Sequence, residues 1–214
     1  MPALFRFDAE MGRSVTPAAL NQHHRVVRAV LCTPRLLLRE WRDSDRVLFA
    51  EMNRDPLVMR HFPGVMERQA SDAFVDRLQD VHRSLGYTLW VVEVTGSERG
   101  KTPFAGFTGL MPPTFDPPFE HCQPVAEVGW RLLPQWWGLG LATEGARASI
   151  AHGFDVVGLP EILSFTVVTN ARSRAVMERI GMRLAGEFDH PRAEPEAHWK
   201  RHTLYRMNPT DART

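Results

Sequence analysis

Residues 125–142 read VAEVGWRLLPQWWGLGLA, a strand-like segment followed by a turn with two glycines and the start of a helix. Inward and outward positions alternate over 125–133, which predicts a β-strand. Gly138 and Gly140 permit a tight turn directly before a helix predicted over 139–157. The first N–H groups of that helix lack partners within it, and the helix dipole favours an anion there. The spacing predicts either a main-chain phosphate cradle or a simple strand-to-helix turn, and by itself leaves both open.

Changes in hydrophobic period extend this pattern in both directions along the chain. The predicted strands are 36–41, 88–94, 104–111, 125–133, 161–169, 182–188 and 199–207, with a hairpin turn at 96–100. The predicted helices are one opening at Asp43–Ser44, a short turn at 55–64, and longer helices over 67–85, 139–157 and 172–180. This order predicts an α+β fold, a mixed sheet with helices on its faces. We expect an N-terminal extension over 1–32, one domain over 33–208 and a short tail over 209–214.

Composition excludes several classes of protein. The chain has 214 residues, of which 43% are hydrophobic and 24% charged, and this is ordinary globular composition. The net charge of +1 gives no support for nucleic-acid binding, and no apolar run approaches the ~18 residues of a membrane span. Cys32 and Cys122 are the only cysteines, so neither a disulfide framework nor a CxxC metal site is expected. With no secretory signal at the start, we expect a cytoplasmic protein without a metal site.

Other phosphate motifs fit poorly. The nucleotide-hydrolysing motif GxxxxGKS/T does not occur. Thr143 replaces the third glycine of a dinucleotide-binding GxGxxG, and the repeated βαβ order of that fold is missing.

Two motifs in order resemble a known family. Residues 135–142, QWWGLGLA, resemble the Q/R-x-x-G-x-G/A acyl-CoA motif of the GNAT N-acetyltransferases. Residues 169–182, TNARSRAVMERIGM, are similar to the second motif of that family, N-x-x-S followed by a helix and G-F/M. With TPRLLLR at 33–39 and EVGW at 127–130, the resemblance points to the RimJ/RimL-like branch and covers about residues 33–207.

The resemblance implies a strongly twisted, mostly antiparallel sheet whose strands 125–133 and 161–169 splay apart. Acetyl-CoA would lie in the opening, its pantetheine on the main chain near Trp130 and its pyrophosphate on the amides of the glycine turn. The implied cofactor-binding residues are Trp130, Arg131, Leu132, Gln135, Trp137, Gly138, Leu139, Gly140, Leu141, Ala142, Thr143, Asn170, Arg172 and Ser173. Arg172, Arg174 and Arg179 are candidates for the 3′-phosphate end, with a solvated helix face as the alternative for each.

The resemblance also suggests which residues move protons. It places a glutamate that acts as general base at Glu127, whereas the alternative for this side chain is an ion pair with an arginine such as Arg131 on the same strand face. An N-terminal α-amine, with a pKa of about 7.7–8.0, is neutral more often near pH 7 than a lysine amine, with a pKa of about 10.4, and so depends less on a general base. Many family members use a tyrosine as general acid, but Met177 occupies that position and can donate nothing. Ser173 is the nearest hydroxyl and our candidate proton donor.

The expected activity is acetyl transfer from acetyl-CoA to a primary amine, either a protein N-terminus or a small molecule, by direct attack in a ternary complex. The alternative is a non-catalytic acyl-CoA-binding sensor, which would need neither Glu127 nor a proton donor. We expect no direct nucleic-acid or membrane partner, and a monomer or homodimer. Five aromatic residues could line the acceptor pocket or belong to the core: Trp41, Phe62, Trp90, Phe107 and Phe165.

Overall fold

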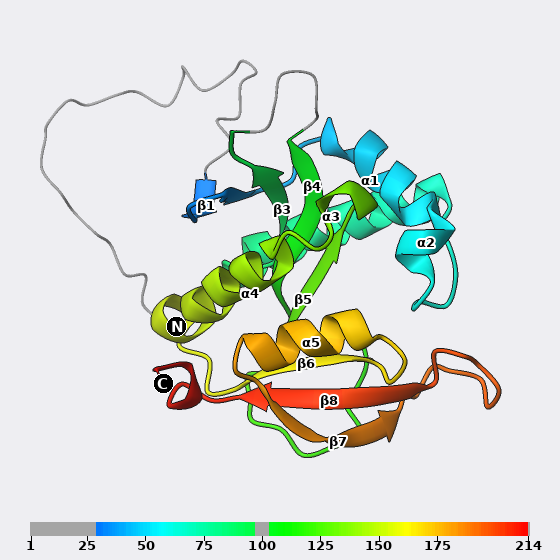
Figure 1. Ribbon diagram of the computed structural model, residues 1–214, viewed down its shortest axis with the longest axis vertical. Coiled ribbons are helices and arrows are strands. Elements are labelled where there is room, and N and C mark those ends of the chain that lie inside the picture. Colours follow the sequence, from blue (N-terminus) through cyan, green and yellow to red (C-terminus); the bar gives the residue numbers. More distant parts are fainter. Residues whose placement is uncertain (1–28, 97–102, 214) are drawn as a thin grey trace, which may run out of the picture.

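The computed structural model describes residues 29–96 and 103–213, within which eight strands form one sheet in the order β1-β2-β3-β4-β5-β6-β8-β7 (Figure 1). The strands are β1 Ala29–Cys32, β2 Leu36–Arg39, β3 Leu89–Val94, β4 Phe104–Met111, β5 Ala126–Leu132, β6 Ile162–Val167, β7 Arg183–Asp189 and β8 Arg201–Met207. The helices are α1 Asp45–Arg54, α2 Pro56–Met59, α3 Arg68–Leu85, α4 Leu141–His152 and α5 Ala171–Arg179. Neighbouring strands are antiparallel except for the parallel pair β5 and β6. The predicted α+β class with a mostly antiparallel sheet is confirmed.

The sheet begins before the expected domain start at residue 33. β1 pairs with β2, with Leu31 opposite Leu38, although it lies inside the expected extension 1–32. Its four residues show no periodicity of their own, so the pairing defines the strand. Residues 1–28, and the predicted 96–100 turn after Gly96, lie outside the described residues.

Backbone conformation moves the start of α4 from the predicted 139 to Leu141. Gly138 and Gly140 have φ of 76° and 77°, in the left-handed region that a right-handed helix excludes. After α4 the predicted helix continues as a π-helical turn, Gly153–Val157. Gly86 ends α3 with φ of 77°, as a C-cap glycine does.

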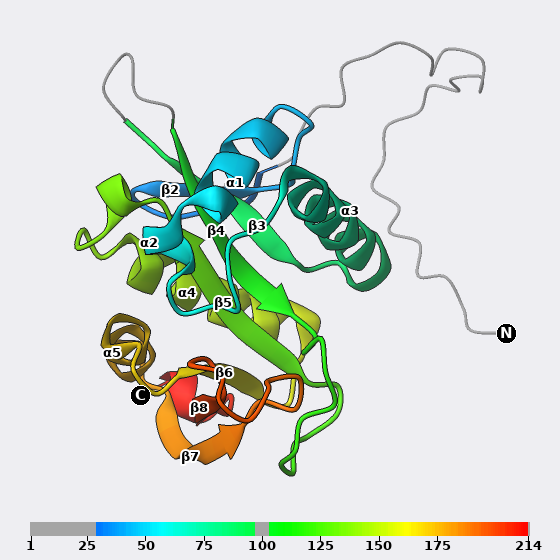
Figure 2. The ribbon, with the colours of Figure 1, turned by 90° about the vertical axis from the view of Figure 1, so that its right-hand side faces the viewer.

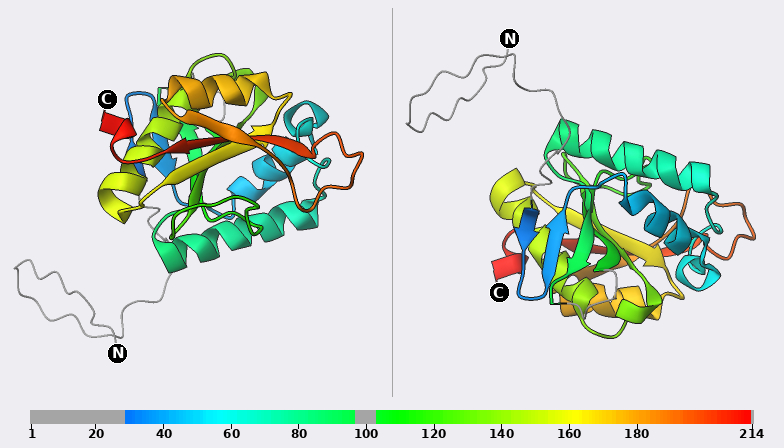
Figure 3. Two further views of the ribbon diagram at one scale, coloured as in Figure 1. Left: turned by 90° about the horizontal axis from the view of Figure 1, so that it is seen from below. Right: turned by 90° about the horizontal axis from the view of Figure 1, so that it is seen from above.

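Helices cover both faces of the sheet. α1 and α3 lie on one face, and α4 and α5 lie on the other (Figures 2 and 3). Val128 and Leu132 of β5 belong to the core cluster beneath α4 and α5. Because side chains alternate along a strand, Glu127 and Arg131 face the α1–α3 side.

The strands β5 and β6 part soon after they meet. Their pairing is limited to Ala126 with Ile162 and Glu127 with Leu163. β5 continues to Leu132 along a diverging path (Figure 1). The expected splay is therefore present, and it opens the sheet on the side of β5 that follows Glu127.

No helix in the described residues is long and apolar enough to cross a membrane.

Candidate active site

A cleft of about 1780 Å³ occupies the opening between β5 and β6. Its walls come from β5, β6, the start of α4, α5, the segment after α2 and the β7–β8 loop. One end therefore meets the glycine turn before α4. The other lies among aromatic side chains on the α1–α3 side of the sheet.

The glycine turn lines the first end of the cleft. Gly138, Gly140 and the residues 141–143 all border it. The first helical hydrogen bond of α4 runs from the Glu144 N–H to the Gly140 carbonyl, so the preceding N–H groups have no partner within the helix. A side chain in the left-handed backbone of Gly140 would be strained. These features suit a main-chain anion site. Gln135 and Leu139 are exposed and do not line the cleft.

Thr33 and Arg35, which lie between β1 and β2, hold this turn through hydrogen bonds that we call the latch. Thr33 Oγ1 donates to Glu144 Oε1 at 2.6 Å, and the Arg35 N–H donates to the same oxygen at 2.9 Å. Arg35 Nε donates to Glu144 Oε2 at 2.6 Å, and its Nη1 donates to the Leu139 carbonyl at 2.8 Å. Partial burial would raise the pKa of Glu144, but these hydrogen bonds and the Arg35 charge bring it below the usual value. Sequence reasoning used residues 33–39 only as a family resemblance and did not foresee this role.

Glu127 projects into the cleft without a partner. It makes no hydrogen bond or ion pair with the described residues, and burial raises the pKa of its carboxyl to about 8. The alternative interpretation, an ion pair with Arg131, is wrong because Arg131 has other neighbours. At pH 7 this carboxyl is mostly protonated, and its carboxylate form is a strong base for its type.

Arg131 is buried on the same face of β5. Its Nη1 donates to Asn53 Oδ1 at 2.6 Å, and its guanidinium lies 4.0 Å from the ring centroid of Phe62 and 5.3 Å from that of Phe107. Burial lowers the pKa of the guanidinium to about 9, so it stays cationic at neutral pH.

Asn170 and Ser173 meet at the start of α5. The Asn170 side chain caps the helix by accepting from the Ser173 N–H at 3.3 Å. Its Nδ2 donates to Thr166 Oγ1 and to Ser173 Oγ, each at 3.0 Å. Ser173 Oγ therefore acts as an acceptor here, while its own proton has no described partner. Both side chains line the cleft.

The arginines of α5 divide between two sides of the helix. The Arg172 guanidinium lies 4.9 Å from the ring centroid of Trp137, and Arg179 Nη1 donates to Thr143 Oγ1 at 3.4 Å. Both line the cleft near the glycine turn. Arg174 instead donates to the Val168 carbonyl and does not line the cleft.

A tyrosine is missing from the cleft. Met177 is buried at the position where the family often has one. The two tyrosines of the chain, Tyr87 and Tyr205, lie in the core outside the cleft lining. The Tyr205 hydroxyl donates to Glu178 Oε1 at 2.8 Å.

The second end of the cleft is aromatic. Phe62, Phe107 and Phe165 line it, whereas Trp41 and Trp90 belong to the core. Of the other candidates, Trp130, Leu132 and Trp137 also border the cleft. No group of three or more potential metal ligands occurs within residues 29–96 and 103–213.

Comparisons with known proteins agree with this geometry. The family model for the acetyltransferase (GNAT) domain matches residues 35–183, more than half of the chain. FsC-acetyl coenzyme A-N(2)-transacetylase of Aspergillus fumigatus is 37% identical over 98 residues, which span 45% of this chain and 39% of that protein. The uncharacterized N-acetyltransferase YnaD of Bacillus subtilis is 29% identical over 161 residues, 74% of this chain and 85% of that protein.

Solved structures share the fold. A GNAT-family acetyltransferase from Bacillus anthracis superposes with a TM-score of 0.66 at 24% identity, covering 85% of this chain and 97% of that one. RimL, a ribosomal L7/L12 alpha-N-protein acetyltransferase in complex with coenzyme A, gives a TM-score of 0.67 at 16% identity, with coverage of 86% and 99%.

Proposed function

This chain belongs to the GNAT acetyltransferase family, and on that basis we propose that it moves an acetyl group from acetyl-CoA to a primary amine by direct attack in a ternary complex. Family membership makes it an enzyme that transfers acyl groups rather than a non-catalytic sensor. The observation that carries the amine-transfer mechanism is Glu127, an unpaired carboxyl with a pKa of about 8 inside the cleft.

The residues around the cleft fit coenzyme A. The free amides of 141–143 and the left-handed glycines offer a cradle for the pyrophosphate, while Arg172 and Arg179 offer charge for the phosphates. The Val128 carbonyl accepts from Ser164 Oγ of β6 at 2.9 Å. Beyond Val128, β5 pairs with no described residue of β6, so its main chain there is open to an extended pantetheine. Asn170 and Ser173 would border that arm. When bound, the cosubstrate supplies the acetyl group as an activated thioester.

Proton transfer then falls to residues of this chain. The amine nitrogen bonds to the acetyl carbonyl carbon, the carbon–sulfur bond breaks, and the products are an acetylated amine and a free thiol. Glu127, directly or through one water, takes the proton that the amine loses. Ser173 gives its hydroxyl proton to the departing sulfur and regains a proton from solvent, while Glu127 releases to solvent the proton that it took. Since an α-amine has a pKa of about 7.7–8.0, its acidity is matched to that of Glu127.

The acceptor is a peptide N-terminus or a small-molecule amine. Among the similar proteins, RimL is named an alpha-N-protein acetyltransferase and the FsC protein is named an N(2)-transacetylase. We further propose a cytoplasmic protein that is a monomer or homodimer and makes no direct contact with nucleic acid.

Calorimetry with acetyl-CoA, followed by thiol release with a panel of peptides and small amines, tests this proposal. We expect micromolar binding and amine-dependent thiol release. Glu127→Gln should lose turnover while binding CoA as before, and Gly140→Val should lose CoA binding. Binding without thiol release for any amine would contradict the proposed reaction.

A further inference from the structure

Arg131 is a buried cation without a counter-charge in the described residues. It is 8% exposed, it lines the cleft, and its Nε has no hydrogen-bond partner. Its one described hydrogen bond goes to the neutral amide oxygen of Asn53. That amide is itself fixed, because its Nδ2 donates to the buried Ser71 hydroxyl at 2.9 Å. A buried charge normally needs a paired and hydrogen-bonded partner.

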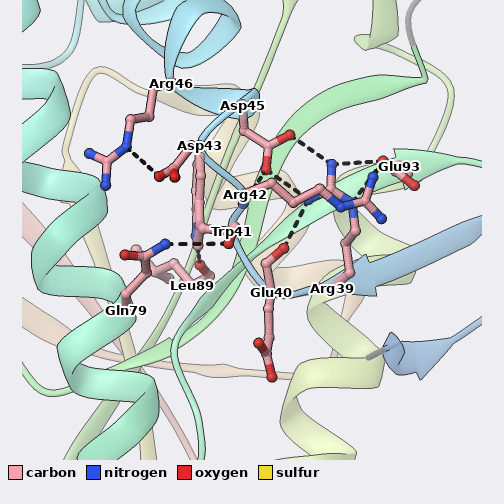
Figure 4. Close-up of polar contacts among 10 residues, drawn as sticks. All are labelled: Arg39, Glu40, Trp41, Arg42, Asp43, Asp45, Arg46, Gln79, Leu89 and Glu93. Atoms are coloured by element: carbon pink, nitrogen blue, oxygen red, sulfur yellow. Dashed lines mark hydrogen bonds and ion pairs between the residues drawn. The ribbon is translucent and has the colours of Figure 1, made fainter. Parts of the chain in front are cut away.

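A second buried arginine in the same protein shows what a structural cation looks like. Arg39, which is 2% exposed, donates to both carboxylate oxygens of Asp45 at 2.7 and 2.8 Å and to Glu93 at 2.7 Å (Figure 4). Burial alone would lower the pKa of Arg39, but these two carboxylates raise it above the usual value. The fold therefore supplies carboxylates where an arginine has only a structural role, and it supplies none to Arg131.

The surroundings of Arg131 also favour an anion from the cleft. Phe62 and Phe107 hold the guanidinium in place and exclude water from it. Besides the arginines already described, three more line the cleft: Arg60, Arg147 and Arg192. The acidic residues of the lining are Glu127 and Glu144, and Arg35 already neutralises the second.

We propose that Arg131 binds a carboxylate carried by the acceptor, so that the acceptor is an anionic amine whose amino group reaches Glu127. This inference rests on the proposed function and names its substrate class. Glu127 and Arg131 are four residues apart on β5, which places their Cα atoms ~13 Å apart. An acceptor that reaches both groups therefore has to span a comparable distance, roughly 10 Å, which is the length of about three extended residues.

A matched pair of acceptors tests the inference. Triglycine and triglycinamide have the same amine and differ in the carboxylate at the other end. We expect kcat/KM for triglycine to exceed that for triglycinamide by roughly 10- to 100-fold, as a charged hydrogen-bond pair implies. Equal values, or acetylation of other amines but neither tripeptide, would overturn the inference.

Variants of Arg131 test whether its side chain causes the preference for triglycine over triglycinamide. Arg131→Met should bring the ratio of the two kcat/KM values close to one, mainly by raising KM for triglycine, and Arg131→Lys should restore part of it. Acetyl-CoA affinity should not change, because the pantetheine would contact position 131 through its main chain and not through its side chain. Arg60→Met is the control, since this exposed arginine also lines the cleft and its loss should leave the ratio nearly unaltered. A folded Arg131→Met protein that keeps the full ratio would contradict the assignment.

Product binding separates the two proposals. Calorimetry of N-acetyl-triglycine and N-acetyl-triglycinamide with the CoA-loaded wild-type protein needs neither turnover nor a folded variant. Tighter binding of the acid by tenfold or more supports the carboxylate site, even if no amine releases thiol and the proposed reaction fails. Equal binding of acid and amide overturns the site, even if other amines are acetylated.

Discussion

Replacing Glu127 by Gln should change the slope of the pH–rate profile as well as the rate. Attack requires the amine to be neutral and Glu127 to be ionised. With the Glu127 pKa at about 8 and an α-amine pKa close to it, two protons must leave below pH 8. Log kcat/KM of the wild-type protein should therefore rise with a slope approaching two below pH 7, because this quantity reports free enzyme and free substrate. In Glu127→Gln the amine alone titrates, and the slope approaches one.

The magnitudes are large enough to measure. For two groups of pKa ~8, kcat/KM should rise about 80-fold between pH 6 and pH 7, against about 9-fold in the variant. General-base catalysis contributes roughly 10²- to 10⁴-fold. Glu127→Gln should lose this whole factor in kcat/KM at pH 9, where Glu127 is ionised. The difference in kcat/KM between the two proteins should shrink about 100-fold by pH 6, where ~1% of Glu127 is ionised.

Thiol release under kcat/KM conditions from pH 6 to pH 9 is the assay. An electron-poor amine that is already neutral at pH 6 provides the control, since the slope should then be one in the wild-type protein and zero in the variant. A defect of the same size at every pH would refute the reasoning, and so would a wild-type slope of one with an α-amine. Either result would mean that Glu127 is ionised well below pH 6 or takes no part in proton transfer.

Three further predictions follow from the same geometry. Because the folded Glu127 carboxyl keeps its proton up to about pH 8 while the unfolded one loses it near 4.5, the wild-type protein should lose stability relative to Glu127→Gln as pH rises through this window. Urea unfolding should show a difference of at most about 1.4 kcal/mol per pH unit. Gly140→Ala and Gly158→Ala both place a side chain at φ near 75° and should each lose about 1–2 kcal/mol of stability, but calorimetry should find weaker acetyl-CoA binding in Gly140→Ala alone. Arg35→Gln should weaken acetyl-CoA binding by roughly tenfold or less, since it releases the half-exposed latch on Glu144, and unchanged affinity would rule out a role for the latch.

Most of the fold follows from local patterns. The 3.6-residue period of α3 and its terminal Gly86 lie within one short segment, so the sequence alone predicts the helix and its end. β1 could not be predicted in this way. Its four residues AVLC form a strand because β2 lies beside them, and such a partner is not encoded in the segment itself.

The candidate site likewise has parts that the sequence predicts and parts that exist only in the folded chain. The glycine turn and the N-x-x-S motif at 170–173 are contiguous in the chain, and sequence reasoning locates both. The latch joins Arg35 to Glu144 across 109 positions, so it exists only in the folded chain. The role of Arg131 is harder still to predict from the sequence, because its defining property is the lack of a carboxylate among its described neighbours. Because the two side chains stand on one strand face, sequence reasoning kept an ion pair with Arg131 open as the alternative to a catalytic role for Glu127.

The spacing along β5 explains why Glu127 and Arg131 stay unpaired. An ion pair needs nitrogen and oxygen within about 4 Å, whereas four strand residues separate the two Cα atoms by ~13 Å. The side chains stand on one face and cannot both lean along the strand, since Asn53 and Phe62 hold the guanidinium. The rigid strand thus keeps a proton acceptor and a cation apart in one apolar cleft. A molecule that carries an amine at one end and a carboxylate at the other satisfies both groups at once, and it brings its nitrogen to the residue that takes the proton.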